Sequence, residues 1–151
     1  MATSREQMNE RGMSLMELVL VIATVGMVLA LTGESVGTLI MRYQSQTVAA
    51  ELVAELQATR LFAMTHRVRV RVLLAPDTAR MKAELADPPG TLIREYDFER
   101  RGVVVHELTN GPALMFYPSG RSASPSTITL RNAIGRIKQV AVSITGRVKV
   151  K

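Results

Sequence analysis

The apolar residues of this chain are concentrated near its start. Residues 18–31 read LVLVIATVGMVLAL without a charge, and the wider segment 13–33 contains one charged residue, Glu17. A helix that spans a bilayer needs about 20 apolar residues, and the wider segment has that length. A helix that is apolar on every face is difficult to cover within a small domain. The pattern therefore does not by itself show whether protein or membrane surrounds residues 13–33.

Three interpretations of residues 13–33 follow from the pattern: a buried core helix, a cleaved secretory signal, or a retained membrane anchor. The stretch before the segment is not net basic, because its two arginines are balanced by two glutamates, and residues 30–32 (ALT) make a poor signal-peptidase site. Glu17 is the difficulty for an anchor. An unpaired carboxylate within the membrane costs about 2–3 kcal/mol or more, so such a residue is a candidate functional group.

A second helical pattern occupies residues 47–64. The segment reads TVAAELVAELQATRLFAM, which is rich in helix formers and lacks Gly and Pro. Its apolar side chains recur at offsets of three, four and seven residues, and they are Ala49, Leu52, Val53, Leu56 and Ala63. If the helix is continuous from residue 13 to about residue 65, it is roughly 80 Å long.

The remainder of the chain has the short-period pattern of strands. Residues 67–74 (RVRVRVLL) alternate strictly, with valines on one face and arginines on the other. Turn signals follow at Pro76-Asp77 and at residues 87–90 (DPPG). Further strands are predicted at Arg80–Leu85, Thr91–Phe98, Gly102–Glu107, Ala113–Tyr117, Ser126–Arg131 and Lys138–Ile144. One long helix followed by short antiparallel strands predicts an α+β fold, with the helix packed on a small antiparallel β-sheet head.

The start of the apolar segment carries a recognisable motif. Residues 12–18 (GMSLMEL), followed by VLVIATVGMVLA, resemble the N-terminal signature of the type IV pilin-like proteins. That signature has Gly, usually Phe, Thr or Ser, Leu, any residue, Glu and Leu before an apolar stretch. Gly26 also falls where the family often has glycine, whereas Met13 stands where Phe is usual. The combination of Gly12 and a lone Glu17 favours this family over an ordinary anchor.

The resemblance implies a specific maturation. A prepilin peptidase would remove residues 1–12 by cutting after Gly12 and would methylate the new amine of Met13. Residues 13–33 would remain as a single transmembrane helix in the bacterial inner membrane, with the N-terminus cytoplasmic. Residues 34–65 would continue as an amphipathic helix, and residues 66–151 would form a β-rich periplasmic head. Glu17 would accept the positive amine of Met13, its own or that of a neighbouring subunit, because a buried charge is tolerated when it is paired.

The C-terminal half carries a second resemblance. The stretches FYPSGRSASPSTITL and IKQVAVSITGRVKV are similar to the GspH/FimT branch of minor pilins and pseudopilins. That branch tends to show Phe-x-x-x-Gly-Arg, then Ile-Thr-Leu, and finally Gly-Arg-x-Arg. The positions that match are Phe116, Gly120, Arg121, Ile128, Thr129, Leu130, Gly146 and Arg147, and Lys149 replaces the second Arg of the closing motif.

Charge is distributed as unevenly as apolarity. The chain has 19 Lys and Arg against 13 Asp and Glu, a net charge of +6. The last 44 residues contain seven cations and no acid. The two-residue period, taken as unbroken from Gln139 to the end, predicts that Arg147, Lys149 and Lys151 share one strand face at steps of about 6.6 Å. Val140, Val142, Ile144, Val148 and Val150 are predicted to share the other face.

Two interpretations of this basic tail remain open. A row of cations can bind phosphates without reading bases, and the resemblance to FimT-type minor pilins implies DNA capture through Arg147 and Lys149, with Lys151 in the same row. No aromatic residue lies within 30 residues before the tail, so a base-stacking platform is not predicted there. Alternatively, the cations protect an exposed edge strand from aggregation or meet acidic subunits or lipid headgroups.

The sequence offers little catalytic chemistry. The chain has no Cys, which excludes a disulfide scaffold, a thiol enzyme and a Cys-ligated zinc site. Its two histidines lack ligand spacing, and no nucleophile elbow or phosphate-binding glycine loop occurs. We therefore expect that the protein is not an enzyme and that it binds neither a metal ion nor a cofactor. The predicted role is a minor pseudopilin or pilin subunit that assembles with other subunits for secretion, and the alternative is a DNA-binding minor pilin.

Overall fold

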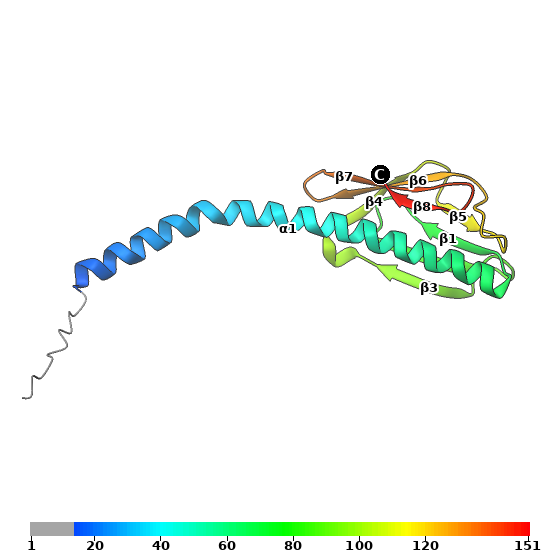
Figure 1. Ribbon diagram of the computed structural model, residues 1–151, viewed down its shortest axis with the longest axis horizontal. Coiled ribbons are helices and arrows are strands. Elements are labelled where there is room, and N and C mark those ends of the chain that lie inside the picture. The colour runs from blue at the N-terminus through cyan, green and yellow to red at the C-terminus, as the bar shows by residue number, and fades with distance from the viewer. Residues whose placement is uncertain (1–13) are drawn as a thin grey trace, which may run out of the picture. The chain divides into compact units, whose positions relative to one another are not determined.

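The computed structural model describes residues 14–151, including their side chains except those of residues 31–36, 38 and 42. A single long helix, α1 (Leu15–His66), precedes all the strands. The chain divides into two compact units on either side of the Gly37–Thr38 bond. The second unit contains the end of α1 and every strand, as Figure 1 shows. The α+β fold class predicted from the sequence is confirmed.

In the second unit, the strands form two four-stranded antiparallel sheets. The first sheet has the order β3-β2-β1-β5 and the second has the order β4-β6-β7-β8. The bounds of the strands are β1 Val70–Leu74, β2 Arg80–Leu85, β3 Leu92–Asp97, β4 Val103–Leu108, β5 Ala113–Phe116, β6 Ser126–Asn132, β7 Ile137–Val142 and β8 Val148–Val150. A short 3-10 helix, η1 (Glu99–Arg101), separates β3 from β4.

The apolar stripe of α1 and the inner faces of both sheets share one core. Ala49, Leu52, Leu56 and Ala63 are fully buried, as the helical periodicity predicted, and Val53 is half-buried against them. Figure 1 shows this part of α1 running between β3 on one side and the sheet that ends in β8 on the other. Burial of the stripe is therefore what orients both sheets on the helix.

Polar contacts fix the ends of the sheets to α1. The Tyr96 hydroxyl donates to Glu51, and the Arg101 guanidinium lies 2.9 Å from the other oxygen of the same carboxylate. The bond from Tyr96 lowers the pKa of Glu51, and Arg101 lowers it further. Burial and the neighbouring carboxylate raise the pKa of Tyr96. On the second sheet, the buried Asn132 amide donates to Ser45 Oγ at 2.9 Å.

The first predicted strand begins later than the alternation indicated. Arg67 has a φ of +56° and ends the helix, and the Val68 amide donates back to the Ala63 carbonyl. This left-handed ending is a common way for a helix to satisfy its last carbonyls. Residues 67–69 therefore form the end of the helix and the connection to the first strand, and β1 begins at Val70.

The prediction of an unbroken period from Gln139 to the end is wrong. The chain turns between Ser143 and Arg147, where the Ser143 amide donates to the Arg147 carbonyl and the Gly146 amide to the Ser143 carbonyl. Gly146 has a φ of +76°, which glycine adopts readily. The result is a hairpin of β7 and β8. Ile144, which was predicted to share a strand face with Val142 and Val148, lies in the turn instead and is exposed.

Candidate functional site

The residues of the pilin-like motif lie at the start of α1. Gly12 and Met13 are outside the described residues. Glu17 lies in the first turn of α1, where its amide donates to the Ser14 carbonyl at 2.9 Å, and it is exposed. The structure therefore describes one member of the predicted Glu17–Met13 charge pair.

Around Glu17, α1 exposes apolar side chains on all faces. Every residue from 14 to 30 is exposed, so this stretch has no apolar face covered by the rest of the described chain. The large apolar side chains exposed there are Leu15, Met16, Leu18, Val19, Leu20, Val21, Ile22, Val25, Met27, Val28 and Leu29. Among the residues that the structure describes, no helix combines the length and the apolarity needed to cross a membrane.

The cations of the tail lie in β8, the edge strand of the second sheet, and directly beside its two ends. Lys149 pairs with Ala141 of β7, the Arg147 carbonyl accepts from Ser143, and the Lys151 amide donates to the Gln139 carbonyl at 2.8 Å. The alternate residues Val140, Val142 and Val148 are buried in the core. The three cations therefore share the solvent face of the hairpin, as the two-residue period predicted, although only Lys149 lies within β8 itself.

The charges of the second sheet differ from those of the first. The ion pairs of the described residues all involve cations between Arg69 and Arg101, and their partners are acids of α1, of the first sheet and of the loop after β2. None of the seven cations of the last 44 residues forms an ion pair with a described residue. Those cations are Arg121, Arg131, Arg136, Lys138, Arg147, Lys149 and Lys151. The basic surface is thus left with uncompensated positive charge.

Two buried glycines position this surface. Arg60 of α1 donates from Nε to the Gly120 carbonyl at 2.7 Å. A Cβ at Gly146 would overlap that same carbonyl oxygen and would lie 2.6 Å from Arg60 Nε. The glycines of the two Gly-Arg motifs therefore meet against one arginine of the helix. The sequence showed both motifs but gave no sign that they are in contact or that Arg60 joins them.

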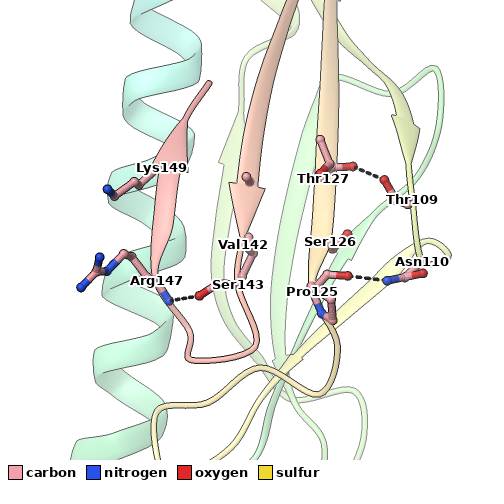
Figure 2. A pocket seen from close by; sticks show the side chains of 10 residues that line it. Thr109, Asn110, Pro125, Ser126, Thr127, Val142, Ser143, Arg147 and Lys149 are labelled. Carbon is pink, nitrogen blue, oxygen red and sulfur yellow. Dashed lines mark hydrogen bonds between the residues drawn. The ribbon is translucent and has the colours of Figure 1, made fainter.

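A groove of about 380 Å³ lies beside the cations, at the start of β6 and the end of β7 (Figure 2). Its lining comes from the loop after β4, from the starts of β6 and β8 and from the end of β7. The residues that line it are Thr109, Asn110, Pro125, Ser126, Thr127, Ala141, Val142, Ser143, Arg147 and Lys149. Sequence analysis identified only its two cations, because the other residues are a loop and strand ends without a motif.

The described residues contain no group of three or more His, Asp or Glu side chains arranged to hold a metal ion. The polar groups of this surface are its cations, its hydroxyls and the amide of Asn110, which donates to the Pro125 carbonyl.

Comparison with known protein families assigns the chain. A family model described as type II transport protein GspH matches residues 48–146, which include the first Gly-Arg motif, the glycine of the second (Gly146) and most of the second unit. The chain belongs to the GspH family. Among curated proteins, none matches the sequence significantly.

Solved structures share the fold of this GspH-family chain. The type IV minor pilin FimU of Pseudomonas aeruginosa superposes with a TM-score of 0.63 at 19% identity, covering 73% of this chain and 90% of FimU. The minor pseudopilin EpsH of the Vibrio cholerae type 2 secretion system gives a TM-score of 0.61 at 16% identity, covering 72% of this chain and 96% of EpsH. At these identities the likeness concerns the fold, a long helix packed on antiparallel sheets.

Proposed function

We propose that this chain is a structural minor subunit of a type II secretion pseudopilus or a related type IV pilus-like fibre, with a role in assembly and protein secretion. The observation that carries the proposal is the exposed apolar start of α1 with the lone carboxylate of Glu17. Apolar surface of this extent is stable only when a membrane or other subunits cover it. Membership of the GspH family and the fold shared with FimU and EpsH support the same role.

In this proposal, a prepilin peptidase removes residues 1–12 and methylates Met13. Residues 13–33 then hold the subunit in the inner membrane, residues 34–65 form the amphipathic helix, and residues 66–151 form the periplasmic head. When the subunit leaves the bilayer, the carboxylate of Glu17 pairs with the terminal amine of Met13 in its own or a neighbouring helix. Pairing makes the burial of both charges tolerable within the packed helices of the fibre.

The Glu17→Ala substitution tests this pairing. The variant should remain in the membrane fraction, because it removes a charge from an apolar segment, but it should fail to enter sheared fibres. Thr24→Ala is the matched control, since Thr24 is exposed on the same stretch and its hydroxyl donates to the Val21 carbonyl of its own helix. Normal fibre incorporation of Glu17→Ala would contradict the pairing.

The Gly12→Leu substitution tests the processing step separately. Glycine lets the backbone extend into a protease cleft that a Cβ would obstruct. We expect mass spectrometry to find the uncut precursor, which is heavier by residues 1–12. Recovery of a protein that begins at residue 13, or one that has lost the whole apolar segment, would count against this maturation.

A second candidate function is DNA binding in uptake, and one observation favours it. The seven cations of the last 44 residues lack ion-pair partners among the described residues, whereas the cations of the first sheet are largely compensated. Uncompensated cations on one face bind phosphates in a salt-dependent manner without reading sequence. In this alternative, the subunit captures DNA through Arg147, Lys149 and Lys151.

Titration of the full chain in non-ionic detergent against duplex DNA tests the second candidate. Binding should weaken with salt, and the double variant Arg147→Ala/Lys149→Ala should reduce the salt slope by about 1 per cation removed. The matched control is Arg80→Ala/Lys82→Ala, which removes two cations that are paired with acids on the first sheet. An absence of binding at low salt, or binding unaffected by the loss of Arg147 and Lys149, would refute this candidate.

A further inference from the structure

The groove beside the basic surface has an apolar floor and a cationic rim. Thr127, Ala141 and Lys149 are opposite one another on three neighbouring strands. Because Ala141 is the smallest of the three, it leaves a hollow between its neighbours. Figure 2 shows Asn110 and Pro125 on one side of this hollow and Arg147 and Lys149 on the other. The volume of about 380 Å³ is typical of sites that bind a small molecule or a single chemical group.

Three polar side chains of the groove form hydrogen bonds within the protein, whereas the buried Ser126 hydroxyl has no partner among the described residues. The Thr109 hydroxyl donates to the Thr127 carbonyl, and Ser143 Oγ accepts from the Arg147 amide. The Asn110 side chain donates one hydrogen bond to the Pro125 carbonyl. Its amide oxygen and its second N–H have no partner among the described residues. The groove therefore offers one free amide edge above an apolar floor.

The charged groups lie beyond the groove rather than inside it. In Figure 2, the side chains of Arg147 and Lys149 extend past β8, on the side away from Asn110. Both residues line the groove at β8, and both are exposed to solvent. A ligand that fits this arrangement has a flat, largely apolar group with a polar edge, joined to negative charge a short distance away.

An unpaired nucleobase on its sugar-phosphate chain has this chemistry. We propose that the groove holds one unpaired base of a single-stranded nucleic acid over Ala141, while Arg147 and Lys149 bind the phosphates on either side of that base. Pro125 and Thr127 contact the faces of the base, and the Asn110 amide bonds to its edge. Bases in a duplex are stacked and paired, so the groove takes them only from single strands. This inference rests on the second candidate function.

The test compares three probes that carry similar phosphates. The full chain, in non-ionic detergent, is titrated by fluorescence anisotropy with a short oligodeoxythymidine, an abasic oligonucleotide of the same length, and a duplex. We expect the oligodeoxythymidine to bind about five-fold more tightly than the abasic strand. This ratio is the lower end of the effect of stacking a base on an aromatic side chain, and it is chosen because none of the described residues that line the groove is aromatic. The affinity of the oligodeoxythymidine, divided by its number of phosphates, should also be higher than that of the duplex.

Ala141→Leu fills the groove without removing a cation and should abolish the advantage of the base-bearing strand. The matched control is Gln139→Leu, which adds a leucine on the same face of β7 outside the groove. Asn110→Ala, in an exposed loop, provides a second variant if Ala141→Leu does not fold. Asn110→Ala should reduce the difference in affinity between the base-bearing strand and the abasic strand.

Equal affinity for base-bearing and abasic strands, or an advantage that Ala141→Leu and Asn110→Ala both leave unchanged, would overturn the inference while leaving DNA binding intact. Binding of none of the three probes would refute the second candidate function as well. A last outcome is that the chain binds a polyglutamate peptide but none of the oligonucleotides, and that Ala141→Leu weakens the binding of the peptide. That result would assign the groove to an acidic protein partner and would also overturn the inference.

Discussion

The contact between the two glycine turns makes a quantitative prediction. Gly146 is buried, has a φ of +76°, and leaves no space for a Cβ, because that atom would overlap the Gly120 carbonyl oxygen. Gly146→Ala therefore has two separate costs. The left-handed conformation costs a residue with a Cβ about 1–2 kcal/mol. Separating the turns also breaks the bond from Arg60 to Gly120, and a hydrogen bond from a charged group contributes about 1.5–3 kcal/mol.

The expected total for Gly146→Ala is a loss of about 2.5–5 kcal/mol in the free energy of unfolding. Urea denaturation of the full chain in non-ionic detergent, followed by circular dichroism, measures it. The free energy of unfolding changes by about 1–3 kcal/mol per molar urea, so the urea midpoint should fall by about 1–5 M. Such a loss is a large fraction of the stability of a typical domain.

Gly135→Ala is the matched control for this prediction. Gly135 has nearly the same φ, +77°, but a Cβ there would meet nothing within 4 Å. It should therefore show only the conformational cost of about 1–2 kcal/mol. If the two variants lower the midpoint equally, the packing of Gly146 against Gly120 and Arg60 does not contribute to stability, and the argument fails.

Two further predictions concern the polar contacts that join α1 to the sheets. Because the folded protein lowers the pKa of Glu51, that carboxylate stabilises the fold at pH values above its unfolded pKa of about 4.3, and the stabilisation is lost as pH falls through the lower folded value. Glu51→Gln should therefore lower the urea midpoint at pH 7 and match the wild type near pH 3; a constant difference at all pH values would contradict this account. Asn132→Ala removes a buried amide that bonds both to α1 and to the Arg136 amide, and it should cost about 1–3 kcal/mol in urea unfolding. A change below about 0.5 kcal/mol, the usual size for surface substitutions, would show that this amide is not a structural link.

Local sequence pattern determined which residues of the head face inward. The stripe of Ala49, Leu52 and Leu56 and the alternation of Val70 and Val72 predicted buried positions that the structure confirms. The prediction succeeds because helices and strands present side chains at fixed periods. The spacing of apolar residues in the sequence therefore indicates which face of each element is buried. The α+β class followed from the same patterns.

Tertiary structure decided which of those elements meet. The period-2 pattern continues through Ser143–Arg147, but the structure turns there, because Gly146 adopts a left-handed conformation that packs against Gly120 and Arg60. Neither contact has a local signal, since the residues are far apart in the chain. The pattern therefore predicted Ile144 on the same strand face as Val142 and Val148, whereas it lies exposed in the turn.

The same division applies to the basic surface. Composition alone showed an acid-free tail and identified Arg147, Lys149 and Lys151. Only the strand register placed Ala141 beside Lys149 and opened a groove toward the loop of Asn110. Charge and periodicity are properties of single segments and can be read along the chain, whereas a hollow between strands depends on the relative sizes of side chains that pairing brings together.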